Sequence, residues 1–207
     1  MKVKFYLFTI IILFFATSNF SQECRESNKS DLLAEDIKVG KFESILVAGD
    51  SNDKCLIPYL RTLSSKNTGV GRYAQIALAK LGDEKAVKDI LDEVDFELAN
   101  EKSTESKFQG IEKLSMVGGK VAFRKFYKIL CDAKPLPETT NEQNEPSHRT
   151  RKLKPKGYPL SVYVVMTHLK GMVSNPPNLS SRNNINFVDD LINHWKKWFE
   201  DHKYLID

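Results

Sequence analysis

Three glycines at regular spacing are the feature that most limits how this chain can fold. Gly49, Gly82 and Gly118 stand 33 and 36 residues apart, a period typical of helical repeat proteins, whose units span roughly 20 to 50 residues. Apolar residues match at one position before, four before and eight after each glycine: Ala48, Leu81 and Val117; Ile45, Leu78 and Leu114; Ile57, Ile90 and Phe126. Aspartate follows the first two glycines, whereas a second glycine follows the third. The spacing therefore predicts repeated helical units, the third of them irregular.

The second unit indicates that each repeat folds as a helix, a tight turn and a second helix. Apolar residues recur at helical spacing from Val70 to Leu81 and again from Ala86 to Val94, which predicts two amphipathic helices that face each other. Between them, Gly82 can adopt the left-handed conformation that ends a helix. Asp83 can then accept hydrogen bonds from the free amides that begin the next helix.

Further helices are predicted on either side of a polar excursion. The same pattern predicts helices over 108–117 and 121–131, with Ser103 as a candidate cap for the first of them. Residues 132–157 are polar and contain four prolines, a composition that cannot bury enough apolar area to order itself. We predict a long loop there. Residues 158–207 are then expected to supply C-terminal helices that complete the same domain as residues 22–131.

The two C-terminal apolar segments differ in how clearly they predict helix. Leu160–Val173 is apolar and rich in valine, so a buried strand is an alternative, but its length and the prolines that follow favour a core helix. In the last segment one helical face is apolar, with aspartates early and lysines late, as the helix dipole prefers. That face comprises Ile185, Val188, Leu191, Ile192, Trp195 and Phe199. We expect it to form a helix that caps the repeats.

The stretch from Val70 to Leu91 resembles a unit of the HEAT-like repeat family, including its subset named after phycobiliprotein lyases. The matching positions are Arg72, Ala74, Ala77, Leu78, Leu81, Gly82, Asp83 and Ala86. Ala48–Asp50 followed by Ile57–Leu60 is similar to the junction that enters another unit, so the resemblance covers roughly residues 45–130. It implies an all-α fold, a short right-handed α-solenoid of antiparallel helix pairs whose concave surface binds other proteins. It also implies a stacking role for Arg72, but the lyase name transfers no chemistry.

The N-terminus has the three-part layout of a secretory signal peptide over residues 1–21. Two lysines precede the apolar run Phe5–Ala16, and a small polar segment with cleavage expected after Ser18 or Ser21 follows it. The run is shorter than the roughly 20 residues that span a bilayer, so a permanent anchor is the less favoured alternative. Lipidation of Cys24 is another, although the residues before it do not form a lipobox. We expect an exported protein, periplasmic or secreted, with no transmembrane segment after signal cleavage.

Three cysteines cannot all pair within one chain. An oxidising compartment permits a disulfide. Cys131 follows an apolar helical run and is expected to be a buried small hydrophobe. Cys24 and Cys55 are therefore the candidate disulfide, although spacing alone does not settle the pairing.

The charge of the chain excludes a strongly basic nucleic-acid binder. Removal of the two lysines of the signal lowers the formal charge from +4 to about +2. One basic cluster lies within residues 148–156 and has no aromatic residues between its charges. A solvated loop is the simpler interpretation. The alternative is electrostatic docking to an acidic partner, an anionic polysaccharide or a lipid headgroup, for which Arg149, Arg151 and Lys152 are the candidate residues.

No motif for catalysis, cofactor binding or metal binding is recognisable in the sequence. The four histidines form no metal-binding spacing with cysteine or carboxylate partners. Cys131 with His168 is a conceivable thiol and base pair, but no motif supports it. Trp198 lies beside Phe199 on the last helix and is a candidate partner-binding residue, because tryptophan is favoured at binding hot spots. Core packing is the alternative for this ring.

Together these features favour a non-catalytic protein-protein interaction module, exported and built from HEAT-like repeats, with an unidentified protein partner. We expect no cofactor, metal or nucleic-acid partner. The alternative is a small-molecule-binding or lyase-like enzyme or chaperone that uses the concave groove. An enzyme would require Cys131, His168 and a carboxylate to converge in one pocket.

Overall fold

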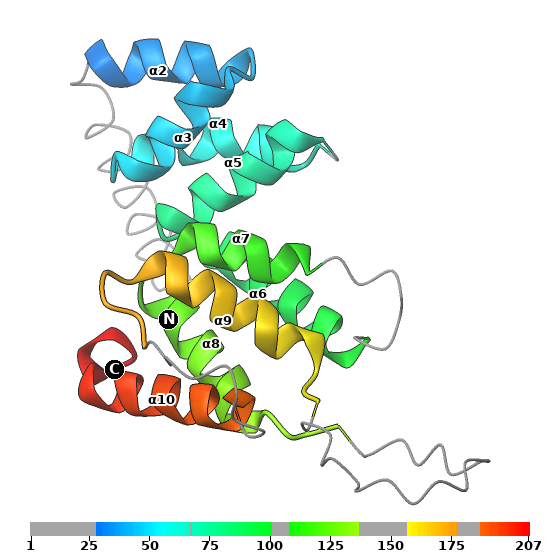
Figure 1. The fold of residues 1–207 in the computed structure, drawn as a ribbon. Helices are drawn as coiled ribbons and strands as arrows, with labels where there is room; N and C mark the ends of the chain where they lie inside the picture. The colour runs from blue at the N-terminus through cyan, green and yellow to red at the C-terminus, as the bar shows by residue number, and fades with distance from the viewer. Residues whose placement is uncertain (1–27, 67, 101–107, 137–156, 178–186) are drawn as a thin grey trace, which may run out of the picture. The chain divides into compact units, whose positions relative to one another are not determined.

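The described part of the chain is all-helical in the computed structural model (Figure 1). The structure describes residues 28–66, 68–100, 108–136, 157–177 and 187–207. Within them lie nine α-helices, α2 to α10, and two short 3-10 helices, and no strand. The all-α prediction is therefore confirmed for these residues.

The chain divides into two compact units, Met1–Glu84 and Lys85–Asp207. The boundary falls at the first residue of α6 (Glu84–Ala99). The helical repeats that the sequence predicts over residues 22–131 therefore belong to two units, and each has its own buried core.

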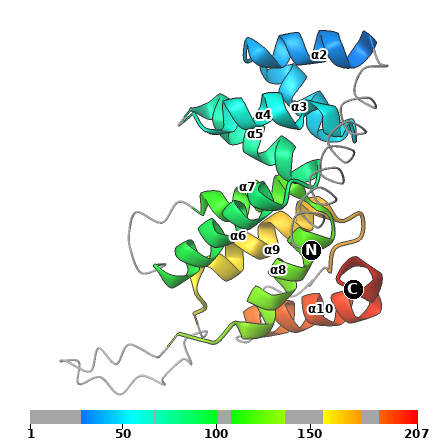
Figure 2. The same cartoon turned by 180° about the vertical axis from the view of Figure 1, so that it is seen from behind.

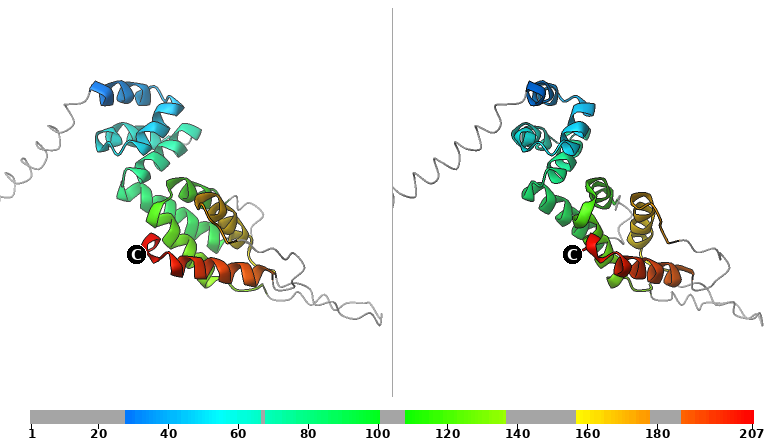
Figure 3. Two further views of the ribbon diagram at one scale, coloured as in Figure 1. Left: turned by 60° about the vertical axis from the view of Figure 1, so that its left-hand side comes forward. Right: turned by 90° about the vertical axis from the view of Figure 1, so that its left-hand side faces the viewer.

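Two pairs of helices and a short 3-10 segment form the first unit (Figures 1 and 3). Its elements are α2 (Asn28–Lys38), α3 (Phe42–Asp50), η1 (Lys54–Leu56), α4 (Ile57–Ser64) and α5 (Gly69–Lys80). Helix α5 packs against both α3 and α4, and α2 packs against the same two helices. The fully buried side chains at these contacts are Ile37, Ile45, Leu56, Leu60 and Ala74.

Gly49 does not form the turn that its place in the glycine alignment predicts. Helix α3 continues through it to Asp50, and the chain turns later, at Asn52, whose φ of 58° is left-handed. A Cβ on Gly49 would lie 3.0 Å from the Cα of Ala77. This glycine is therefore placed where α3 and α5 approach closely, because that contact leaves little room for a side chain.

Gly82 has the left-handed conformation that the sequence predicts, while the hydrogen bonds of Asp83 to the first amides of α6 stay a prediction. Gly82 has a φ of 81°, which ends α5 in the left-handed conformation, and Asp83 directly precedes α6. The amide of Asp83 donates to the carbonyl of Leu78 at 3.0 Å. Asp83 is 5% exposed, and its carboxylate accepts hydrogen bonds from Arg61 Nε at 2.8 Å and from the Arg61 Nη2 at 2.6 Å. This ion pair ties α4 to the turn after α5.

Five helices form the second unit (Figure 2). Four follow α6: α7 (Gln109–Val117), α8 (Gly119–Asp132), α9 (Leu160–Met172) and α10 (Phe187–Asp201), with η2 (Lys203–Leu205) after them. Helix α9 packs against α7 and α8, while α10 and η2 pack against α8. The helix predicted over Leu160–Val173 is confirmed, and the strand alternative is wrong. The predicted terminal helix is confirmed as α10, although Ile185 lies outside the described residues.

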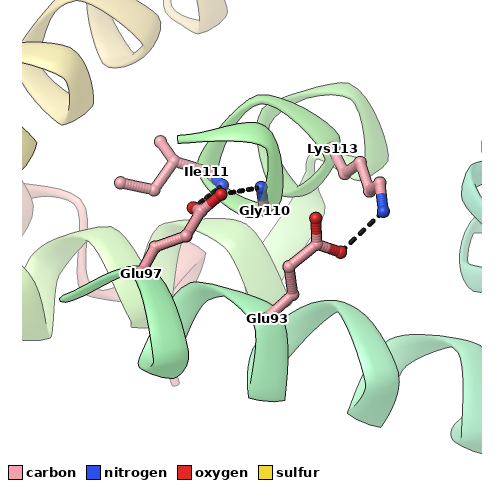
Figure 4. Close-up of polar contacts among 5 residues, drawn as sticks. All are labelled: Glu93, Glu97, Gly110, Ile111 and Lys113. Atoms are coloured by element: carbon pink, nitrogen blue, oxygen red, sulfur yellow. Dashed lines mark hydrogen bonds and ion pairs between the residues drawn. The ribbon is translucent and has the colours of Figure 1, made fainter. Parts of the chain in front are cut away.

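The first turn of α7 is capped by a side chain that belongs to another helix, α6 (Figure 4). Its local N-cap residue is Phe108, which is left-handed with a φ of 48° and has no side-chain oxygen to offer. The buried carboxylate of Glu97, on α6, instead accepts hydrogen bonds from the amides of Gly110 at 2.9 Å and Ile111 at 3.3 Å. These amides would otherwise lack helical partners, so Glu97 stabilises the first turn. Ser103, the predicted cap, lies outside the described residues.

Candidate functional site

The basic residues proposed for partner binding, Arg149, Arg151 and Lys152, lie outside the described residues. Residues 136 and 157, which stand on either side of this cluster in the sequence, contact each other in the second unit. The amide of Leu136 donates to the carbonyl of Gly157 at 2.8 Å. Whether the basic cluster contacts a partner stays a prediction.

Trp198 is half-buried on α10, at the edge of an aromatic cluster. Its ring stacks on His202 with centroids 4.2 Å apart, and it meets Phe199 edge-on at 5.2 Å and Trp195 at 5.7 Å. Trp195 and Phe199 are buried, whereas Trp198 and His202 are both half-buried, so this stacked pair is a partly exposed edge of the cluster. A partner-binding role for it stays a prediction.

Two further aromatic residues of the first unit, Tyr59 and Tyr73, contact other helices of that unit. The ammonium group of Lys38 lies 5.1 Å from the centroid of the Tyr59 ring, a cation-π distance. Tyr73 meets Phe42 edge-on at 4.5 Å. These contacts join α2 to α4 and α3 to α5, so both rings help to hold the unit together.

Cys131 is exposed, which corrects the expectation that it is a buried small hydrophobe. It is a free thiol beside Tyr127, and its hydrogen bond with the phenol raises the pKa of Tyr127. No hydrogen bond or ion pair of the described residues joins it to His168, which is half-buried on α9. Cys55 is disulfide-bonded. Cys24 lies outside the described residues, so its pairing with Cys55 stays a prediction.

The titratable side chains of the described residues form no group of three or more histidine, cysteine or carboxylate side chains suited to a metal ion. The Nδ1 atoms of His194 and His202 instead lie 2.6 and 2.7 Å from the carbonyls of Asp190 and Trp198, one turn earlier on the same helix. None of the described helices is long and apolar enough to cross a membrane.

Exposed apolar side chains concentrate on the first two described helices. Of the eleven large apolar side chains that are exposed in the described residues, five lie between residues 32 and 47. Leu32 lies in α2 and Val39 directly follows its last residue, Lys38; each is 74% exposed, and the spacing of seven residues places both on one side. On α3, Phe42 and Leu46 share a side and are each 40% exposed, and Val47 is 56% exposed. We call these five residues the α2–α3 surface.

The segment that carries the α2–α3 surface is acidic. Residues 31–50 contain five carboxylates, Asp31, Glu35, Asp36, Glu43 and Asp50, against two lysines, Lys38 and Lys41. Lys38 pairs with Glu35 at 2.5 Å and Lys41 with Asp36 at 2.6 Å, and the second contact lowers the pKa of Asp36. Both pairs are solvent-exposed and contribute little to stability. Asp50 pairs with Lys80 of α5 at 2.8 Å, so these paired charges cancel, and Asp31 and Glu43 leave the segment with a net negative charge.

A cleft of about 300 Å³ opens between three helices of the second unit. Its apolar wall is formed by Leu98 of α6, Ile129 of α8 and Val162 of α9, together with Ala133 and Pro159. Its polar lining is Asp95, Lys125, Lys128, Asp132, Lys134 and Ser161. Neither Cys131 nor His168 lines it. Sequence analysis did not single out these residues, because they come from segments up to 67 positions apart, from Asp95 to Val162.

Two ion pairs involve residues that line this cleft, one between α6 and α8 and one within α8. Lys125 contacts Asp95 and Lys128 contacts Asp132, the latter at 2.6 Å. The hydrogen bond from Lys128, with further attraction from Lys134 and Lys125, lowers the pKa of Asp132. Three lysines against two aspartates leave the lining with one excess positive charge. Lys125 is also the most enclosed of these paired charges, because its side chain is 14% exposed.

Tyr158, which precedes α9, links the start of that helix to α10. It is 9% exposed and donates a hydrogen bond to the Asp189 carboxylate. Burial and this bond raise its pKa from 10.0 to about 12. Because the folded-state pKa exceeds that of the unfolded chain, the stabilising contribution is complete below pH 10 and is lost as the pH rises towards 12.

We expect Asp189→Asn to lower the pKa of Tyr158 without returning it to 10.0, since burial is the larger cause and remains. A 13C NMR titration of the tyrosine Cζ signals measures this change. Asp201→Asn, at the far end of α10, is the matched control and should leave the pKa of Tyr158 unchanged. Since the amide oxygen of asparagine can still accept the hydrogen bond, an unchanged titration in Asp189→Asn would show that the negative charge of Asp189 is not a cause.

Comparisons with protein-family models, with curated proteins and with solved structures found no match for this chain. The resemblance to HEAT-like repeats therefore rests on the matching positions between Arg72 and Ala86 and on the similar junction after Ala48.

Proposed function

We propose that this protein is a non-catalytic protein-protein interaction module that is exported to the periplasm or secreted. In this proposal its helices form a short right-handed α-solenoid of antiparallel HEAT-like pairs, with a long polar loop and α10 as the capping helix. The observation that carries the proposal is the α2–α3 surface. Five large apolar side chains exposed within one short segment are unfavourable in water unless a partner covers them.

The surroundings of the α2–α3 surface indicate the chemistry of the partner. Apolar side chains would supply most of the favourable free energy on burial, while the excess of carboxylates would select a partner of opposite charge. We therefore assign to this surface a protein segment that combines apolar and basic side chains, such as a basic amphipathic helix. Exposed ion pairs at the edge would affect the association rate more than the affinity.

Site-specific photo-crosslinking tests this proposal. The full chain, with a C-terminal tag, is expressed in a Gram-negative host and a photoreactive phenylalanine analogue is placed at Leu32 or Val47. The control position is Thr62, which is exposed on α4 of the same unit. We expect one discrete crosslinked protein with a basic amphipathic segment from the first two positions and none from Thr62. The mass of the exported chain tests cleavage after Ser18 or Ser21 in the same preparation.

Charge reversal then tests the chemistry of the contact. Asp31→Lys with Glu43→Lys should reduce crosslinking at least tenfold, roughly, because like charges would then face the partner. Asp89→Lys with Asp201→Lys makes the same change of net charge at exposed sites of the second unit and should have no effect. Equal crosslinking at Thr62, or a reversal without effect, would remove the α2–α3 surface as the site.

The same assay with Arg149→Glu, Arg151→Glu and Lys152→Glu, or with Trp198→Ala, tests the two other candidate surfaces.

The alternative function is a small-molecule-binding or lyase-like enzyme or chaperone that uses a groove. The cleft of the second unit favours small-molecule binding over catalysis, because its lining contains lysines and aspartates but neither Cys131 nor His168. A volume of about 300 Å³ is at the lower end for small-molecule sites.

A further inference from the structure

We propose that the cleft between α6, α8 and α9 binds a small organic anion with a single negative charge and a short apolar chain. This site lies in the second unit and is independent of the α2–α3 surface. It can therefore exist whether or not the protein is an interaction module.

The walls of the cleft match the two parts of such a ligand. Leu98, Ile129 and Val162 form an apolar side, and the latter two are 7% and 2% exposed, so they are fixed in the core of the unit. An apolar chain placed against them would be transferred out of water, which is favourable in proportion to the apolar area that is buried. Rigid walls also keep the loss of conformational entropy on binding small.

The charges of the cleft favour an anion of one negative charge. The pairs Lys125–Asp95 and Lys128–Asp132 are each neutral, so Lys134 supplies the excess positive charge. Lys125 remains able to donate further hydrogen bonds, because an ammonium group has three donors and its ion pair uses one. Its position, largely enclosed, strengthens a charge-assisted hydrogen bond with a ligand.

The first turn of α9 adds to the positive potential. Pro159, Ser161 and Val162 line the cleft, and they stand at the N-terminus of a 13-residue helix. Pro159 occupies the N-cap position and makes no side-chain cap hydrogen bond, and its carbonyl accepts a hydrogen bond from the amide of Val162 at 3.1 Å. The partial positive charge of a helix N-terminus favours an anion. This contribution supplements the lysines and the apolar wall, on which the assignment rests.

The volume of the cleft sets the size of the ligand. About 300 Å³ corresponds to roughly ten water molecules of liquid. A ligand with about ten non-hydrogen atoms therefore fits, and octanoate is a suitable probe with a carboxylate. Hexyl phosphate is a probe of similar size with a phosphate monoester, used at about pH 5.5 so that it carries mainly one negative charge, and 1-octanol is the neutral analogue.

Titration of the full chain, labelled with 15N, by each of the three probes tests the proposal. We expect octanoate or hexyl phosphate to bind with a dissociation constant of about 1 mM or below. The amide shifts should concentrate on Leu98, Ile129, Ala133 and Ser161. The probe that binds more tightly distinguishes a carboxylate ligand from a phosphate ligand, and 1-octanol should bind at least about tenfold more weakly than either.

Lys125→Met keeps the length of the side chain but removes its charge, and it should weaken binding of the preferred anion by about tenfold. Asp95 then loses its partner but is 62% exposed and stays hydrated, so the unit should still fold. Lys134→Gln should weaken binding less, because Lys134 is exposed. Lys170→Gln, an exposed change on α9 outside the cleft, is the control and should have no effect.

Any of three results would overturn the proposal. The first is the absence of binding by both anions at about 10 mM, ten times the expected dissociation constant. The second is equal binding by 1-octanol and the anions, and the third is equal binding by Lys125→Met and the unsubstituted chain, since the charges would then have no role. None of these results affects crosslinking at Leu32 or Val47, so the failure of this site and the failure of the interaction module can be told apart.

Discussion

Replacement of Gly110 with alanine should destabilise the second unit by about 3 kcal/mol. A Cβ at this position would lie 2.8 Å from the amide nitrogen of Val94 and 3.0 Å from the carbonyl carbon of Glu93. Both atoms belong to the backbone of α6, so no side-chain rotation can relieve the contact. The first turn of α7 would have to move away from α6, which would also weaken the two hydrogen bonds from this turn to Glu97 (Figure 4).

Urea unfolding followed by tryptophan fluorescence measures this effect, because both tryptophans lie on α10 in the same unit. Gly171→Ala is the matched control. Gly171 is also helical, and a Cβ there would meet no atom within 4 Å. Alanine at this position should stabilise the unit by about 0.5 to 1 kcal/mol. If Gly110→Ala behaved like the control, α6 and α7 would not be in close contact.

Truncation of Phe199 to alanine should destabilise the second unit by about 4 kcal/mol. The side chain is fully buried between α8 and α10. Its ring lies 5.2 Å from Tyr127 and 6.1 Å from Phe123 on α8, and it also meets the two tryptophans of α10. Alanine would leave a cavity in the middle of this aromatic cluster. The loss combines the transfer of the ring to water with the contacts that the cavity removes.

Circular dichroism at 222 nm during urea unfolding is the better measurement here, since the substitution alters the surroundings of both tryptophans. Tyr204→Ala is the control. Tyr204 is 66% exposed in η2, so its removal should change the free energy of unfolding by less than about 0.5 kcal/mol. A loss below about 1 kcal/mol for Phe199→Ala would show that α10 does not depend on this ring for its packing.

Periodic apolar patterns predicted the helices of the repeats and of the C-terminal part well. The stripe from Val70 to Leu81 corresponds to α5, and the apolar face ending at Phe199 corresponds to α10. Gly82 was predicted correctly for a physical reason, since few residues other than glycine adopt its φ of 81° without strain. These features depend on neighbours along the chain, and so a single sequence records them.

The candidate sites were not predictable in the same way. The α2–α3 surface was missed because a sequence does not show which of two apolar sides is covered. In α2 the side with Ala34 and Ile37 is buried, and the side with Leu32 and Val39 is not. The cleft was missed because its lysines and apolar residues come together only when α6, α8 and α9 pack. Cys131 was misjudged for a related reason, since it follows buried residues but lies on the opposite side of α8.

The sequence by itself determined the all-α class, the approximate ends of most helices and the left-handed end of α5, because these follow from side-chain periodicity and local backbone sterics. Only the tertiary structure decided that Gly49 lies at a helix contact, that Glu97 caps α7 and that a lysine-lined cleft exists. Each of these depends on a contact between residues far apart in the chain. The free energy of such contacts comes from packing, which local patterns do not encode.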